Sequence, residues 1–154
     1  MTKILHHSVQ LNCDAHLAFE MFTVNKLLQS WFTKLADVEP VGGGKYELFW
    51  DPEDRENNST IGCKITAIEQ DKLLSFDWKG PVQYKHFMNN ADPLTQVVVS
   101  FFPCGDGADP CTEVHIIHTG WRNSSEWEEA RMFFEKAWSN VLKELRKAVN
   151  EYNT

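Results

Sequence analysis

The sequence lacks any apolar run long enough to cross a bilayer, which requires about 20 consecutive apolar residues. Its first residues, Met1 to His7, also lack the apolar core of a secretion signal. The first absence excludes a membrane-spanning helix, and the second argues against export. We therefore expect a cytoplasmic protein.

Positive charge is also scarce. The chain has 15 Lys and Arg residues against 22 Asp and Glu residues, which gives a formal net charge of -7 and a pI of about 5.3. An acidic surface repels the phosphates of nucleic acids and the anionic headgroups of membranes. We therefore expect neither a nucleic-acid partner nor a membrane partner.

Metal-binding motifs are missing as well. The sequence has no Cys-x-x-Cys pair, and its histidines are either adjacent on one predicted strand or dispersed, so we expect no metal and no other cofactor. In a reducing compartment, free thiols are expected at the four cysteines: Cys13, Cys63, Cys104 and Cys111. One alternative stays open, because Cys104 and Cys111 flank a turn rich in Gly and Asp and can face each other across a hairpin.

Aromatic side chains, in contrast, are abundant. The 154 residues include ten Phe and six Trp, and we predict one domain over residues 1–154 because this length is typical of a single domain. Large rings either line a cavity or fill the concave side of a curved sheet. Composition does not decide between these two interpretations.

Alternating polar and apolar residues indicate an antiparallel sheet. The alternation predicts strands over residues 3–11, 45–50, 60–69, 73–78, 95–102 and 112–119. After the first strand, apolar residues at helical spacing predict two short helices, at 15–22 and 24–31. The run Gly42-Gly43-Gly44 reads as a turn, because no helix follows it as a phosphate-binding loop requires. Residues 80–93 show the least pattern, which predicts a long, partly apolar loop near the sheet edge with room for a helical turn.

The C-terminal segment predicts one long amphipathic helix. Ser125 and Glu128 match a capping box. Apolar residues then recur at steps of three and four: Trp127, Phe134, Trp138, Val141, Leu145 and Ala148. Strands grouped before a helix are typical of the α+β class. We predict a helix-grip (Bet v 1-like) fold, in which a curved antiparallel sheet wraps around this helix and the two short helices close one end.

Several motifs occur in the order found in one known family. They are Ala15 to Thr23, Trp31-Phe32, Val41 to Tyr46, Gly62 to Ile65, Leu73 to Trp78, Thr112 to Trp121 and Trp138 to Leu145. On these motifs, which cover nearly the whole chain, the sequence resembles the activator of Hsp90 ATPase homologue 1-like family, within the START-like or Bet v 1-like (SRPBCC) superfamily.

The resemblance implies a hydrophobic cavity between the sheet and the last helix. Related domains bind lipids, hormones or polyketides, a few catalyse cyclisation, and others assist a chaperone. The sequence lacks the separate N-terminal domain of the eukaryotic activator, which argues against direct stimulation of an Hsp90 ATPase. Because one fold hosts many functions, the function has to be argued from the site.

Our leading hypothesis is a non-enzymatic binding domain whose apolar cavity holds a small hydrophobic ligand, either lipid-like or aromatic. The candidate lining residues are Trp31, Trp50, Phe76, Trp78, His118, Trp121, Phe134 and Trp138. The alternatives are a chaperone-associated (Hsp90 co-chaperone-like) interaction module and a cyclase or hydrolase acting on an aromatic or polyketide-like substrate.

His118 is the most informative polar residue on the predicted inward faces, which it shares with Val114 and Ile116. It is either a polar anchor or general base in the cavity, or a core histidine bonded to a neighbouring element. We favour the core histidine, because no second acid or base is predicted on its face, and we assign no catalytic residue. The chain is expected to be a monomer or a homodimer, since sheet edges and the apolar segment Tyr84 to Met88 need cover.

Overall fold

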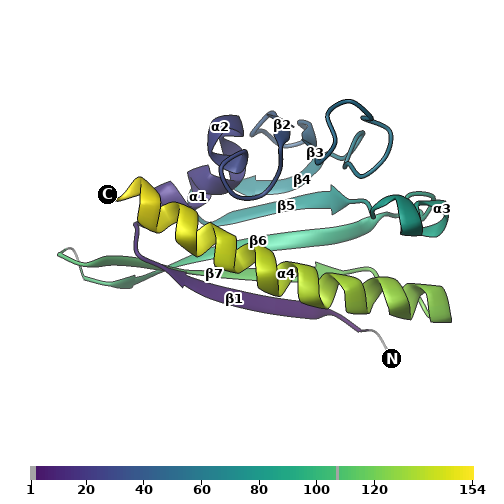
Figure 1. Ribbon diagram of the computed structural model, residues 1–154. Coiled ribbons are helices and arrows are strands. Elements are labelled where there is room, and N and C mark those ends of the chain that lie inside the picture. The colour runs from purple at the N-terminus through teal and green to yellow at the C-terminus, as the bar shows by residue number, and fades with distance from the viewer. Residues whose placement is uncertain (1–2, 107) are drawn as a thin grey trace.

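The computed structural model describes residues 3–106 and 108–154 (Figure 1). Its elements follow the predicted order of one strand, two short helices, a set of strands and a long helix. They are β1 (Leu5–Leu11), α1 (Ala15–Thr23), α2 (Asn25–Leu28), β2 (Leu35–Val38), β3 (Tyr46–Phe49), β4 (Ile65–Glu69), β5 (Leu73–Trp78), η1 (Val82–Tyr84), α3 (Lys85–Met88), β6 (Thr95–Gly105), β7 (Pro110–Thr119) and α4 (Ser125–Tyr152).

Five strands form one antiparallel sheet in the order β1-β7-β6-β5-β4. Helix α4 crosses one face of this sheet, and α1 and α2 lie near its C-terminal end (Figure 1). Alternation along the strands turns apolar side chains toward α4, as in β7, where Val114, Ile116 and His118 are all buried. The predicted architecture, a curved antiparallel sheet with a long C-terminal helix, is therefore confirmed.

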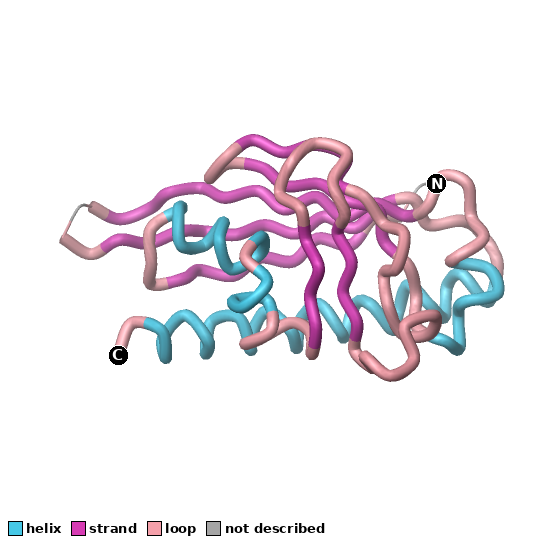
Figure 2. Tube along the Cα trace, turned by 90° about the horizontal axis from the view of Figure 1, so that it is seen from above, coloured by secondary structure: helices cyan, strands magenta, loops and turns pink. Residues whose placement is uncertain are grey.

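A short ribbon of β2 and β3 extends this architecture. Its strands pair antiparallel, from Leu35 opposite Phe49 to Val38 opposite Tyr46. Isolated bridges join the ribbon to the segment before β4, at Lys45 with Lys64 and at Phe49 with Ser59. The ribbon runs across the direction of α4 (Figure 2). Strand β2 was not predicted from the sequence, because a four-residue segment between a helix and a turn carries little periodic signal.

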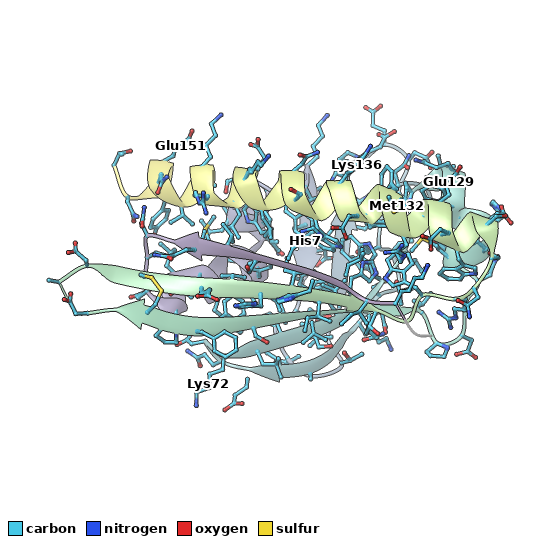
Figure 3. The ribbon with its side chains drawn as sticks, turned by 90° about the horizontal axis from the view of Figure 1, so that it is seen from below. His7, Lys72, Glu129, Met132, Lys136 and Glu151 are labelled. Atoms are coloured by element: carbon cyan, nitrogen blue, oxygen red, sulfur yellow. A yellow bond between two sulfur atoms is a disulfide. The ribbon has the colours of Figure 1, made fainter. Side chains whose placement is uncertain are left out.

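Helix α4 begins as predicted, but its cap is one residue earlier. Ser124, not Ser125, is the N-cap, and its hydroxyl accepts a hydrogen bond from the Trp127 N–H at 3.1 Å. The buried stripe is Ala130, Phe134, Trp138, Leu142, Leu145, Ala148 and Val149. The opposite side carries charged residues, among them Glu129, Lys136 and Glu151 (Figure 3).

Two other sequence predictions need correction, and a third is refined. The predicted strand over 60–69 shortens to Ile65–Glu69, because Gly62 adopts φ +86° in a turn before it. Residues 80–93 contain η1 and α3 within the predicted loop. The β6–β7 hairpin extends further than predicted, and its register places Cys104 opposite Cys111, where the two form a disulfide. The free-thiol prediction is therefore wrong for this pair, whereas Cys13 and Cys63 are free and buried.

Within the described residues, no helix combines the length and the apolar character that a bilayer crossing requires.

Candidate functional site

A cavity of about 330 Å³ lies between α4 and the end of β5. We call it the α4 cavity. Its walls come from α4, from the residues after β5, from the loop after β3 and from the turn after α2. They are Phe32, Trp50, Asn58, Ser59, Trp78, Lys79, Gly80, Pro81, Phe133, Phe134, Ala137, Trp138 and Val141. Most of this surface is aromatic or aliphatic, which suits an apolar guest.

The alternation of β5 and the helical spacing of α4 position the main walls of the cavity. In β5, Leu74, Phe76 and Trp78 alternate onto the face that α4 covers, so Trp78 arrives at the strand end beside the helix. On α4, Phe134, Trp138 and Val141 recur at helical spacing and face the same space. A strand end and a helix stripe therefore converge on one cavity.

Edge and face contacts between rings hold the aromatic wall together. The Trp78 ring centroid lies 5.4 Å from that of Trp138, 5.9 Å from that of Phe32 and 6.0 Å from that of Trp50. Trp50 is fixed at the mouth, because its indole N–H donates to the Phe32 carbonyl at 2.8 Å. Trp50 and Phe133 remain 39% and 38% exposed, so both rings border the opening.

The indole nitrogen of Trp78 is an exception in this wall. Trp78 is 3% exposed, and among the described residues its Nε1–H finds no hydrogen-bond acceptor. A buried donor without a partner costs roughly 1–3 kcal/mol, so such groups are rare in folded proteins. Among the described residues, the hydrogen-bonding capacity of this cavity wall is therefore not fully used.

His118 is fully buried and does not line the cavity. The Trp138 indole N–H donates to His118 Nδ1 at 3.0 Å, so Nδ1 carries no proton. His118 Nε2 then holds the proton and donates to the Thr95 hydroxyl at 3.0 Å. Burial lowers the pKa of His118 to about 3, because a charged imidazolium would lose its hydration. This geometry favours the core histidine over a general base.

The structure divides the eight candidate residues into two groups. Trp50, Trp78, Phe134 and Trp138 line the α4 cavity. Trp31, Phe76, His118 and Trp121 lie outside its lining: Trp31 donates to the Met21 carbonyl, Phe76 stacks on Tyr46, and Trp121 donates to the His118 carbonyl.

Sequence reasoning missed several lining residues. On α4 these are Phe133 and Ala137, which flank the predicted stripe, and Val141 was predicted on the stripe without being named for the cavity. The segments 58–59 and 79–81 belong to loops, where periodicity gives no orientation. Phe32 had a signal, because it belongs to the Trp31-Phe32 pair that carried the family resemblance.

Several solved structures share this fold, three of which follow. A structural-genomics protein from Mesorhizobium loti has a TM-score of 0.75 and 16% identity, over 97% of this chain and 98% of that chain. The Aha1 dimer from Colwellia psychrerythraea has a TM-score of 0.69 and 14% identity, over 96% of each chain. An HSP90 activator from Plasmodium falciparum has a TM-score of 0.69 and 17% identity, over 96% of each chain. At these identities the likeness concerns the fold alone.

None of the curated proteins compared with the chain matches it. The family described as "Activator of Hsp90 ATPase homolog 1-like protein" matches residues 12–150, which span α1 through most of α4. This match covers far more than half of the chain and confirms the resemblance seen in the sequence motifs. The chain belongs to the activator of Hsp90 ATPase homolog 1-like family.

Proposed function

We propose that this protein is a binding domain that holds a small hydrophobic molecule in the α4 cavity. The observation that carries the proposal is the cavity itself, about 330 Å³ in volume and walled mainly by rings and aliphatic side chains. Such a surface is unfavourable to water, because it offers water few hydrogen-bond partners. An apolar guest that displaces this water is stabilised by the apolar area that it buries.

The mouth supports the same proposal. Trp50 and Phe133 border it while more than a third exposed, so apolar surface continues from the cavity to the outside. Large exposed rings around a hollow are typical of sites that bind apolar partners. An apolar ligand would cover both rings as it enters.

Dye binding tests this proposal. N-phenylnaphthylamine is an uncharged aromatic dye whose emission rises in apolar surroundings, and we expect it to bind the wild-type protein at one site. Ala137 lines the cavity, so Ala137→Phe should fill part of it and weaken dye binding by about tenfold or more. Ser139→Phe adds the same ring at an exposed position of α4 and should bind the dye like the wild type. Equal binding by the two variants, or none by the wild type, would contradict the proposal.

The family match favours a second candidate function, a co-chaperone-like interaction module. The exposed acidic residues of the loop after β3, namely Asp51, Glu53, Asp54 and Glu56, offer a surface for a basic partner. A purified Hsp90 mixed with this protein tests the idea by its ATPase rate and by co-sedimentation. Reversal of Glu53 and Asp54 to Lys should weaken any complex, and a wild-type protein without effect on either readout would exclude this function.

A cyclase or hydrolase that uses His118 as its base receives the least support. The imidazole is fully buried, both ring nitrogens are engaged by Trp138 and Thr95, and the residue is not part of the cavity lining. A general base has to reach the proton that it abstracts, directly or through one water.

A further inference from the structure

Lys79 stands where the apolar cavity meets a second hollow. It follows Trp78 directly at the end of β5 and lines the α4 cavity. It also lines a neighbouring hollow of about 500 Å³, which is otherwise polar or charged over most of its wall. That wall comprises Glu56, Ile61, Lys79, Val82, Lys85, His86, Asn89 and Asn90. Lys79 is therefore a residue that the α4 cavity and the second hollow share.

The ammonium groups beside this junction have no carboxylate partner. Lys79 Nζ donates to the Ile61 carbonyl at 2.5 Å, and Lys85 Nζ donates to the Glu56 carbonyl and to Asn57 Oδ1, both at 2.9 Å. Among the described residues, no Asp or Glu oxygen comes within 4.0 Å of either ammonium. In a chain with a net charge of -7, this leaves positive charge in one place without an acidic partner.

Among the described residues, Lys79 and Asn58, which both line the α4 cavity, each keep donors without a partner. An ammonium has three N–H groups, and the Ile61 carbonyl takes one of them. Asn58 also lines the α4 cavity, and its side-chain oxygen accepts from the Val82 N–H at 2.9 Å, which leaves its NH₂ group to other partners. Glu56 is the single carboxylate among the residues that line the two hollows. The junction thus offers donors and positive charge beside an apolar wall.

We propose that the ligand of the α4 cavity is an amphipathic acid, with an apolar body among the rings and a carboxylate that pairs with Lys79. This inference rests on the proposed function, because it specifies the molecule that the cavity holds. The apolar walls bind the body, whereas the ammonium and the Asn58 amide bind the anionic head through charge-assisted hydrogen bonds. Lys85 lies in the second hollow and adds favourable potential at the same end.

Competition between matched acids and alcohols tests this inference. Bound N-phenylnaphthylamine is displaced by naphthaleneacetate or naphthaleneethanol, and in a second pair by decanoate or decanol. Within each pair, the two molecules have the same apolar body and differ only in the polar headgroup, which is a carboxylate or a hydroxyl. An ionised carboxylate is far better hydrated than a hydroxyl, so without a cation in the site the alcohol should bind more tightly. We expect the acid of at least one pair to bind about tenfold more tightly than its alcohol, and that pair identifies the body as aromatic or aliphatic.

Three variants assign this preference to Lys79. Lys79→Met should remove the acid preference, and Lys79→Arg should retain it because the positive charge remains. Lys136→Met removes the same charge from the exposed side of α4 and should behave like the wild type (Figure 3). The readout in each variant is the ratio of acid affinity to alcohol affinity, so a change in dye affinity at the altered Lys79 position cancels, and Lys136→Met should leave dye binding itself unchanged.

The possible results separate the two proposals. An alcohol that binds as tightly as its acid in both pairs overturns the inference while dye binding still supports the apolar cavity. An acid preference that survives in Lys79→Met also overturns it, since the anion must then bind elsewhere. A wild-type protein that does not bind the dye overturns the proposed function, and the inference with it.

Discussion

Two neighbouring aromatic regions of the molecule are built from the same kinds of side chain and differ in whether space remains between the rings and whether their polar atoms are paired. In the first, which we call the filled region (Phe22, Trp31, Tyr46 and Phe76), ring centroids lie 3.9 Å apart for Tyr46 and Phe76 and 5.0 Å apart for Phe22 and Trp31. Its polar tips are paired: the Tyr46 hydroxyl donates to the Phe22 carbonyl at 2.8 Å and the Trp31 indole to the Met21 carbonyl at 2.9 Å.

The second region, the α4 cavity, keeps about 330 Å³ open and leaves the Trp78 indole N–H unpaired among the described residues. Aromatic content therefore does not distinguish a packed core from a binding cavity. Rings contact one another in both regions, so the distinction lies in whether open space remains between them and whether their polar atoms find partners. The filled region pairs its polar tips, whereas the α4 cavity keeps open space and one indole donor without a partner among the described residues, which fits the proposed binding function.

Truncation of one ring in each region should give the largest difference in the free energy of unfolding. Phe22 is fully buried, so Phe22→Ala should lower the free energy of unfolding by about 3–5 kcal/mol through lost contacts and a new void. Phe133→Ala removes a ring that is 38% exposed at the cavity mouth and should cost about 1 kcal/mol or less while it weakens dye binding. Urea unfolding measures both values. Equal losses of stability would show that the cavity mouth is as tightly packed as the core.

Acid should act on the cavity side of this comparison, where His118 accepts a hydrogen bond from the cavity-lining Trp138. Burial lowers the pKa of His118 to about 3, against about 6.5 in the unfolded chain, so below pH 6.5 the unfolded state binds more protons. Stability should therefore be constant with respect to this group above pH 6.5 and fall by roughly 1.4 kcal/mol per pH unit below it. Unfolding experiments between pH 6.5 and pH 5 avoid most carboxylate titration.

His118→Gln provides the control for this pH dependence. The amide can accept from the Trp138 indole and donate to Thr95, as the imidazole does, and it does not titrate. The variant should lose the slope between pH 6.5 and pH 5. A slope that remains unchanged would assign the acid sensitivity to other groups.

A matched pair of Trp→Phe substitutions, one in each region, should give the smallest difference in stability. Trp31→Phe leaves the Met21 carbonyl without its partner, whereas Trp78→Phe removes a donor that has none among the described residues. Both remove a similar ring volume, so Trp31→Phe should be the more destabilising by about 1 kcal/mol. Circular dichroism during urea unfolding measures the difference without relying on tryptophan emission. Equal costs would mean that the Trp78 N–H is satisfied, for instance by water.

The sequence predicts some elements of the fold more accurately than others. Strand β5 was predicted over its observed range, Leu73–Trp78, because strict alternation ends at a turn on one side. Strand β2 was missed because its four residues show no clear period. The helix cap differed by one position because the capping-box pattern favours Ser125, which has Glu128 three residues later, whereas the extended backbone of Ser124 and its bond from the Trp127 N–H make Ser124 the cap.

The candidate site was predicted in part, for a related reason. Periodicity shows which side chains face inward, and all eight candidates except Trp50 are buried. It does not show which inward rings meet one another. Trp31 and Phe76 therefore looked equivalent to Trp78 and Trp138, although only the latter two border the open space. Lys79 was not singled out, because a charged residue that ends a strand is usually solvated.

The pairing of β1 with β7 has a consequence for how the chain reaches this structure. Strand β1 is an edge strand, and its register joins Leu5 to His118 and Leu11 to Thr112. Strand β1 therefore has no sheet partner until synthesis has continued through β7, which begins at Pro110. Because contacts so distant in sequence carry a high entropic cost of closure, closing this edge is expected late in folding. Helix α4 follows β7 in the sequence and packs against β1. The helix can therefore cover the complete sheet only after β1 has paired with β7.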